Sequence, residues 1–517
     1  MQKNENTSRA ALTLKNVSWG YINTLLTGII TFITRTMIVL IMGERFNGVN
    51  GLFSSVLGVL SFAELGFGVA LNYSLYKPAA EGDKEKLKSL MQLYKRTYRI
   101  IAAVIAAAGL CLLPFLDVLV KDPGDVGNIR IYYLFFLFNT VTSYFVSYKY
   151  SLVNAMQENF RFSRINMVTK ISVSLLQIAA LALGRSYLIY LAVGAVAELA
   201  YKAAVSVYLD RKYPLLSDKN IRPLDAQERK AISTNVRAMV WHKVGDVCVY
   251  QTDNILISAF VGVAVTGRVT YYNTFTNAAL QVMNAALSAV VGNMGNAMAD
   301  STSQRRHELF CAYRMVAFWI SGFLSIGMFF MASRLVAMTV GESMVLPQLV
   351  LFLILLDFYM GGHRIALNNF KAAGGVFRQD QYVALLQAGV NLVSSILFVR
   401  LFGLPGVYMG TVLQGTLSTV IRPFIVYKAM FGTGAGEYFV SSARYLAVMA
   451  AASAVCWAAD TWLFAGNTLL CFVLELLFIT VAVNGIFLLC LCRTREFRYL
   501  WNKLASKIFA RFIKRKK

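Results

Sequence analysis

The chain has 517 residues, of which 57% are hydrophobic and 15% charged, and its formal net charge is +24. Water-soluble proteins carry about a quarter charged residues, so this composition excludes an ordinary soluble domain. Taken by itself, the excess of lysine and arginine is typical of nucleic-acid-binding proteins. The distribution of these residues along the chain has a simpler explanation.

Apolar runs of more than about 18 residues, long enough to cross the ~30 Å hydrocarbon layer of a membrane as a helix, recur throughout the sequence. We therefore predict an all-α polytopic membrane protein with about 14 transmembrane helices. A transmembrane β-barrel would show segments of about ten residues with alternating polarity, and none is evident. In chain order, the predicted spans cover residues 16–43, 46–71, 97–120, 129–157, 162–183, 186–209, 233–262, 268–296, 308–332, 347–370, 380–402, 404–430, 440–464 and 466–491.

Basic residues are concentrated in alternate loops between these spans. Residues 84–96 and 211–230 are rich in lysine and arginine, whereas the intervening loops carry one or two basic residues each. Because cytoplasmic loops carry the excess of basic residues, both termini are predicted to lie in the cytoplasm. This asymmetry accounts for the net charge without a nucleic-acid partner.

The first span, 16–43, carries a polar stripe along one helical face that includes Asn16, Thr31 and Arg35. An arginine near the middle of a span costs roughly 2.5–3.5 kcal/mol on insertion scales, so such residues usually face a cavity or a partner. We therefore expect Arg35 to face a polar interior. The second span has a similar stripe, which contains Glu64.

Two segments resemble copies of one unit. An asparagine begins each, Asn16 in the first and Asn235 in the second, and three further positions match at offsets of 27, 32 and 37 residues. The matched pairs, each 219 residues apart, are Gly43 with Gly262, Gly48 with Gly267, and Phe53 with Tyr272. Such a repeat predicts two pseudo-symmetric six-helix lobes around a central cavity, with the substrate site between them.

This repeat sets the predicted domains. They are an N-terminal lobe over 1–230, a C-terminal lobe over 231–432, a helix pair over 433–492 and a basic amphipathic cytoplasmic tail over 493–517. The tail has apolar residues at helical spacing and cations elsewhere, which predicts a helix on the anionic inner leaflet. Residues 81–96 show the same pattern, through Leu87, Leu90, Met91 and Tyr94.

The spans of the second half are rich in polar residues. The seventh carries Asp246 and Asp253, and the tenth carries Arg364 seven residues after Asp357. The eighth carries an amide ladder next to Tyr271, formed by Asn273, Asn277, Gln281 and Asn284. A single polar residue most often joins two helices. Long stripes that carry both charge signs instead predict a water-filled cavity, and hence a transporter.

The residue types of this cavity suggest a cargo. Amides and aromatic rings suit a sugar, and arginine forks suit phosphate oxygens. We predict that a phosphate or pyrophosphate binds Arg35, Lys170 and Arg364, and that the amide ladder and Tyr271 line the glycan site. The candidates for ion coupling are Asp253, Asp246 and Glu64. Cationic cavities also accept acidic drugs and nucleotides.

Asp253 falls one residue from the repeat counterpart of Arg35. The two side chains are therefore expected to pair in the empty protein, and a substrate anion would displace Asp253. The rival interpretation of Arg364 is a static ion pair with Asp357.

The seven cysteines lie in or beside apolar spans, with no CxxC and no spacing typical of metal ligands. No nucleotide-binding loop, HExxH or GxSxG motif occurs either. We therefore predict no metal, no cofactor and no enzymatic activity, so that any energy comes from an ion gradient, from flux or from a partner.

Three stretches resemble a known family. They are "AELGFGVALNYSLYKPAAEGDKEKL" at 63–87, "TDNILISAFVGVAVTG" at 252–267, and residues 358–413, with Gly374-Gly375 before Arg378, Asn391, Gly403-x-x-Gly406 and Gly410-Thr411. Together they resemble the polysaccharide-transporter branch of the MATE and flippase superfamily, the O-antigen and capsule repeat-unit flippases.

The resemblance implies a bacterial inner-membrane protein that moves undecaprenyl-pyrophosphate-linked oligosaccharide from the cytoplasmic to the periplasmic leaflet. It implies alternating access between the lobes, Na+ or H+ coupling, and polysaccharide assembly proteins as partners. It also implies that Arg35 binds pyrophosphate, since related flippases use a first-span arginine for this. The alternative is a cation-coupled multidrug exporter of the same fold. A membrane polymerase or ligase would need a large outer loop, and every predicted outer loop is short.

Overall fold

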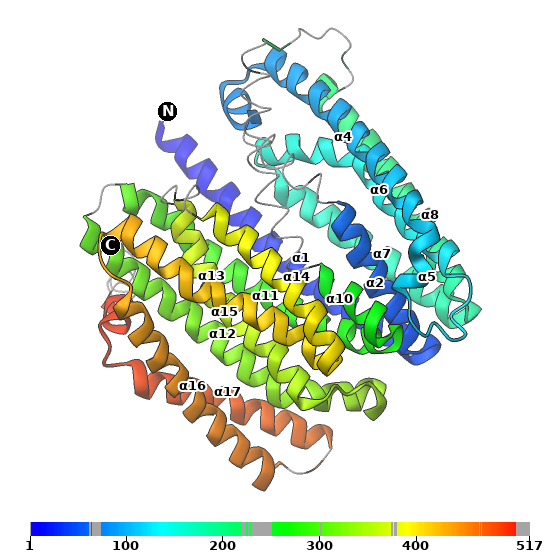
Figure 1. Ribbon diagram of the computed structural model, residues 1–517. Helices are drawn as coiled ribbons and strands as arrows, with labels where there is room; N and C mark the ends of the chain where they lie inside the picture. Colours follow the sequence, from blue (N-terminus) through cyan, green and yellow to red (C-terminus); the bar gives the residue numbers. More distant parts are fainter. Residues whose placement is uncertain are drawn as a thin grey trace. The chain divides into compact units, whose positions relative to one another are not determined.

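Figure 1 shows a computed structural model of the chain. It describes the backbone of residues 2–61, 64, 74–216, 218, 224–225, 228, 251–299, 302–373, 376, 380–464, 466 and 468–502. Every regular element in these residues is a helix, which confirms the predicted all-α fold. The chain divides into two compact units: unit 1 is Met1–Thr274 with Ser395–Val407, and unit 2 is Phe275–Ser394 with Tyr408–Lys517.

Ten helices in the described part of the chain are long and apolar enough to cross a membrane. They are Ser18–Met42, Lys84–Leu119, Ile129–Ala155, Phe162–Gly184, Tyr187–Lys212, Ser303–Val340, Gln348–Lys371, Tyr382–Phe402, Gly436–Trp462 and Leu469–Leu491. Each overlaps a predicted span, although Lys84–Leu119 begins 13 residues before the predicted 97–120, so the protein is a multi-pass membrane protein. Of the four remaining spans, the second corresponds to a helix of only 17 described residues, and most of the seventh lies outside the described residues. The total of fourteen stays a prediction.

Unit 1 contains most of the first half of the chain. Its elements are α1 (Gln2–Met42), α2 (Glu44–Leu60), α4 (Lys84–Leu112), η1 (Leu113–Phe115), α5 (Leu116–Leu119), α6 (Ile129–Ala155), α7 (Asn159–Gly184), α8 (Tyr187–Lys212), η2 (Pro214–Leu216), α10 (Thr252–Leu256), η3 (Ile257–Val261) and the beginning of α11 (Val263–Ala299). Helix α6 packs against both α4 and α8, and α7 packs against α1 and α8 (Figure 1).

The apolar face at the start of α4 lies in the core of unit 1. Leu87, Leu90, Met91 and Tyr94 are all at most 2% exposed and belong to one apolar cluster. The prediction that this face rests on the membrane surface is therefore wrong. The periodicity was that of an amphipathic helix, but α4 continues into a membrane span and its apolar stripe packs against neighbouring helices.

The matched glycines of the repeat share a backbone conformation. Gly43 separates α1 from α2 with φ of 96°, and Gly262 separates η3 from α11 with φ of 142°. Both values lie in the region that side chains other than glycine rarely adopt. Phe53 and Tyr272, the aromatic pair of the repeat, are both buried. The repeat therefore holds as local structure at these positions, whereas the predicted lobe boundaries stay predictions.

Unit 2 is organised around α12. Its elements are the rest of α11, α12 (Ser303–Val340), η4 (Glu342–Met344), α13 (Gln348–Ala373), α14 (Gln381–Phe402), α15 (Leu404–Val426), η5 (Tyr427–Phe431), α16 (Gly436–Trp462) and α17 (Leu469–Leu491), apart from the α14–α15 turn that belongs to unit 1. The hydrogen-bonding of η3 and η5 is that of a π-helix. Helix α12 contacts α13, α16 and α17.

The predicted C-terminal helix pair is present as α16 and α17, which lie side by side in Figure 1. The pair packs on α12 through a stack of rings: Phe318 lies 4.3 Å from Tyr445 and 5.0 Å from Phe487, between ring centroids. The tail begins on the same surface, where Phe497 stacks on Trp319 at 6.4 Å. The start of the tail therefore packs against protein, and its remainder beyond 502 lies outside the described residues.

Candidate functional site

Arg35 is fixed by a buried amide. Its Nη1 donates to Oδ1 of Asn47 at 3.0 Å, and Nδ2 of Asn47 donates to the carbonyl of Gly267 at 2.7 Å. Asn47 is fully buried in the first turns of α2. Tyr187 and Tyr190 on α8 lie close enough to Arg35 to act on it electrostatically. One asparagine thus orients the Arg35 side chain and joins α1, α2 and α11.

Arg35 carries its charge without an acidic neighbour in the described part of the chain. No described carboxylate lies within 4.0 Å of its guanidinium, so the expected ion pair with Asp253 is not formed. Arg268 is the opposite case, because Glu44 holds it through two bonds of 2.6 and 3.0 Å. Arg35 reaches Asn47 because Gly43 reverses the chain between them. Among the described residues, its partner is thus an amide and not a carboxylate.

Lys170 lies in a different part of unit 1, where α6, α7 and α8 enclose a polar cavity of about 210 Å3. Lys170 and Asn166 come from α7, and Glu198 and Lys202 come from α8. Lys202 Nζ lies 3.4 Å from Glu198 and donates to the carbonyl of Asn139 at 2.9 Å. Lys170 itself is exposed. The cavity offers cations, an amide and a carboxylate to a polar ligand.

Glu198 and Lys202 were not singled out from the sequence. The signal was present, because the two residues stand four positions apart within the apolar span 186–209. Residues at that spacing lie on one helical face, and ionisable pairs inside a span mark polar interiors. Asn47 was also missed, since an asparagine beside a hairpin glycine is equally typical of an ordinary turn.

Arg364 lies in unit 2, where it is 5% exposed and pairs with Asp357 on the same helix at 2.8 Å. Gly415 of α15 lies directly against this pair, because a Cβ there would meet both side chains. This geometry matches the rival interpretation of a static ion pair. A role of Arg364 in pyrophosphate binding stays a prediction.

The four amide side chains of the α11 ladder differ in their exposure to solvent. Asn277, Gln281 and Asn284 are exposed, and Asn273 is partly buried. Residues 273 and 284 are separated by about 16 Å along the helix axis, at 1.5 Å per residue. Tyr271 is fully buried, and its hydroxyl bonds that of Thr36 at 2.7 Å. The accessible donors and acceptors of the ladder are therefore the three amides after Asn273.

The candidates for ion coupling have separate surroundings. Glu64 accepts a hydrogen bond from the Tyr144 hydroxyl on α6. Asp253 lies in α10, and the neighbouring Asn254 donates to Ser55 at 3.0 Å. Asp246 lies outside the described residues. The structure of the described residues therefore does not gather these acids into one site.

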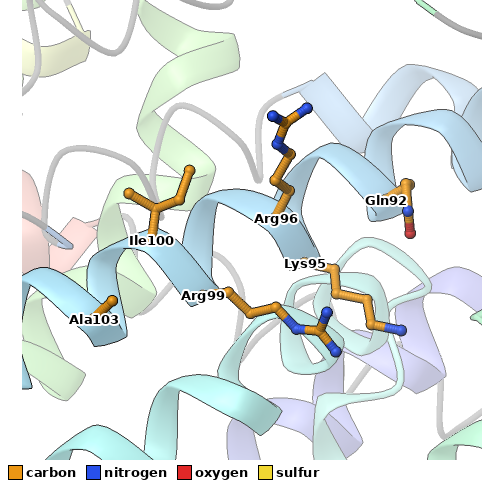
Figure 2. Close-up of a pocket in the computed structure, with 6 residues that line it drawn as sticks. All are labelled: Gln92, Lys95, Arg96, Arg99, Ile100 and Ala103. Carbon is orange, nitrogen blue, oxygen red and sulfur yellow. The ribbon is translucent and has the colours of Figure 1, made fainter.

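A cluster of three cations lies on α4. Lys95, Arg96 and Arg99 line a hollow of about 450 Å3. In Figure 2, Lys95 and Arg99 are directed to the same side of the helix. Arg96 and Arg99 are exposed, as is Ile100. This helix face joins positive charge to apolar surface, a combination that suits the headgroup region of a membrane.

Comparison with known proteins gives the fold and the family context. A family model described as "Polysaccharide biosynthesis protein" matches residues 13–292. No curated protein matches. Among solved structures, the lipid II flippase MurJ in an inward closed conformation has a TM-score of 0.67 and 12% identity, covering 92% of this chain and 99% of that chain.

Two further solved structures are transporters. A mutant of the Vibrio cholerae MATE transporter VcmN has a TM-score of 0.58 and 15% identity, over 83% of this chain and 99% of that chain. An inward-facing multidrug resistance MATE family transporter of the MOP superfamily has a TM-score of 0.56 and 12% identity, over 78% of this chain and 96% of that chain. The chain therefore has the fold of this superfamily, whose matched members are transporters and flippases rather than enzymes.

Proposed function

Because the chain belongs to the polysaccharide biosynthesis protein family, we propose that it is a flippase for undecaprenyl-pyrophosphate-linked oligosaccharide. The cargo is the repeat unit of an O-antigen, capsule or exopolysaccharide. It moves from the cytoplasmic to the periplasmic leaflet of a bacterial cytoplasmic membrane, and both termini of the protein lie in the cytoplasm. The fold shared with MurJ, a lipid II flippase, supports a lipid-linked cargo.

One observation carries the choice of a pyrophosphate lipid. Arg35 lies inside the apolar helix Ser18–Met42, held by Asn47 and with no described carboxylate within 4.0 Å. A partly buried cation without a counterion is costly in a membrane protein, and a phosphate oxygen pair is the partner that a guanidinium binds best. The anion of the cargo offsets that cost while it is bound.

The remaining predicted residues have separate roles in binding and moving the cargo. The exposed amides of α11 hydrogen-bond the sugars, each amide offering donors and an acceptor. Lys170 provides a second cation at the cavity between α6, α7 and α8, and Arg364 a third. The polyprenyl tail stays in the lipid while the headgroup crosses. Movement of Na+ or H+ at Asp253, Asp246 or Glu64 would drive the change of access, and the C-terminal tail would rest on the anionic inner leaflet.

The test is flipping of a fluorescent polyprenyl-pyrophosphate oligosaccharide in proteoliposomes that contain Arg35→Ala. We expect at least a tenfold loss of rate at unchanged protein stability. The matched control is the double variant Glu44→Gln/Arg268→Gln, which removes an arginine of the same unit together with its carboxylate. The control should keep most of the activity.

Each outcome of this test favours one interpretation. Equal flipping rates of Arg35→Ala and the wild type would mean that Arg35 serves only to pack helices together. If the wild type flips no lipid and instead exports a cationic dye along an ion gradient, the alternative of a cation-coupled multidrug exporter holds. The fold shared with multidrug MATE transporters is the observation that keeps this second candidate open.

A further inference from the structure

Three potential metal ligands meet where α12 and α16 begin. His307 and Cys311 lie one turn apart on α12, and Glu437 lies in the first turn of α16. One side-chain atom from each, an imidazole nitrogen, the sulfur and a carboxylate oxygen, lies within 4.8 Å of the other two. Ligands four residues apart on one helix face are a common half of a zinc site.

The distances from His307 to the other two side chains are compatible with a shared ion. His307 Nε2 lies 3.6 Å from Cys311 Sγ and 3.7 Å from Glu437 Oε2. The second distance exceeds the usual N–H···O range of about 2.7–3.2 Å. Around zinc, with bonds of about 2.3 Å to sulfur and 2.0–2.2 Å to nitrogen or oxygen, tetrahedral ligand atoms lie about 3.3–3.6 Å apart. The two distances from His307 are therefore close to the spacing that one tetrahedral ion requires, and the third, between Cys311 and Glu437, is at most 4.8 Å.

The surroundings orient the ligands. The His307 ring is packed edge-on by Tyr427 at 5.4 Å and Phe431 at 5.0 Å, both from the π-helical η5. Ser303, one turn before His307, donates to the Phe431 carbonyl at 2.7 Å. These contacts hold the start of α12 against η5 and limit rotation of the imidazole. Glu437 is 65% exposed and His307 22% exposed, which leaves an open path from solvent.

The local charge also suits a divalent cation. The Glu437 carboxylate lies within 4.8 Å of the Cys311 sulfur, whereas Glu496 is paired with Arg444 at 3.0 Å. The Arg314 guanidinium is occupied elsewhere: it donates to Ser441 at 2.7 Å and to the Tyr438 carbonyl at 3.0 Å. Glu437 is therefore the carboxylate that these contacts leave to a cation bound beside His307 and Cys311.

We propose that His307, Cys311 and Glu437 bind a borderline-soft divalent cation, with Zn2+ as the natural occupant and the fourth coordination position open to water. Thiolate and imidazole ligands favour zinc over magnesium or calcium. The bound ion would join the first turns of α12 and α16, and so fasten the C-terminal helix pair to the core of unit 2. This site is independent of the proposed flippase function.

The test is a Co2+ titration of the full-length protein in detergent, purified on an affinity tag without histidine. Thiolate ligation of Co2+ gives a near-ultraviolet charge-transfer band, and tetrahedral geometry gives intense visible bands. We expect saturation at one Co2+ per chain and displacement by Zn2+. Cys311→Ser should abolish the near-ultraviolet band, and the control Cys456→Ser, a buried cysteine elsewhere in unit 2, should keep it.

Two further variants distinguish loss of the metal site from loss of folding. Glu437→Gln alters an exposed side chain and should weaken Co2+ binding at least tenfold, and His307→Ala should remove the rise in melting temperature that Zn2+ causes in the wild type. A wild type without the near-ultraviolet band, or a band that survives Cys311→Ser, would overturn the proposal. So would equal Co2+ affinity of Glu437→Gln and the wild type.

Discussion

Gly48 of α2 and Gly267 of α11 face each other where the two helices cross. A Cβ atom built on Gly48 would lie closer than 3.0 Å to the carbonyl oxygen of Val263, and one on Gly267 closer than 3.0 Å to that of Glu44. The two glycines are equivalent positions of the repeat, 219 residues apart. Equivalent positions that touch reciprocally indicate a local two-fold relationship between these helix ends.

This crossing predicts that Gly48→Ala and Gly267→Ala each damage the protein. The obstructing atoms are backbone, so no side-chain rotation relieves the clash, and overpacking of this kind costs about 1–3 kcal/mol or more. We expect a lower melting temperature in detergent and at least a tenfold loss of flipping. Gly20→Ala on α1, where the Cβ meets nothing within 4 Å, is the control and should match the wild type. Wild-type stability of both crossing variants would mean that α2 and α11 do not stay packed this closely.

Asn47→Ala should weaken stability and transport together. The substitution removes the donor to the Gly267 carbonyl and the acceptor that orients Arg35. The Gly267 carbonyl keeps the N–H donor of its own helix, so the loss is that of one buried hydrogen bond, about 0.5–1.5 kcal/mol. We expect a fall of that size in the free energy of unfolding and a loss of flipping smaller than that of Arg35→Ala. Ser54→Ala, whose exposed hydroxyl bonds only its own helix, should change neither. Loss of stability without loss of flipping would separate Asn47 from Arg35.

Asp380 is paired with two cations, so we expect its substitution to destabilise the protein strongly. It is 1% exposed, with Lys371 and Arg422 as its partners, the latter at 2.9 Å. Asp380→Asn leaves two buried cations without a counterion, which costs about 3–5 kcal/mol. Replacing all three by neutral residues should recover most of the loss. Asp117→Asn, which breaks an exposed pair with Arg130, should cost under about 1 kcal/mol in the same unfolding measurement. A mild effect of Asp380→Asn would show that water reaches this cluster.

The attachment of α17 to α12 depends on Arg334. Its guanidinium binds Asp460 of α16 at 2.6 Å and Glu475 of α17, whose side chain is 1% exposed. We expect Arg334→Met to lower the free energy of unfolding by about 3–5 kcal/mol, because both carboxylates lose their partner. In a double-mutant cycle, Arg334→Met and Glu475→Gln together should lower the free energy of unfolding by less than the sum of the two single losses. Additive losses would show that the two residues act separately.

Local features of the sequence predicted local features of the structure. Ten apolar runs became membrane-length helices because hydropathy over about 20 residues decides whether a helix can lie in a bilayer. Gly43 and Gly262 became helix breaks with positive φ because glycine alone adopts that backbone at little cost. Residues 81–96 show the limit of this reasoning: their helical period was correct, but a period does not say whether lipid or protein covers the apolar face.

The polar partners were decided only by the tertiary structure. Arg35 was expected to meet Asp253 and instead meets Asn47, which in turn bonds Gly267, 220 residues later in the chain. Glu437 lies beside Cys311 although the spacing of the cysteines gave no sign of a metal site. Such pairs depend on which helices pack together and at what height. Hydropathy determines neither the neighbours of a helix nor its height relative to them, because any sufficiently apolar helix can lie in the bilayer. Side-chain packing and hydrogen bonding between helices select the neighbours.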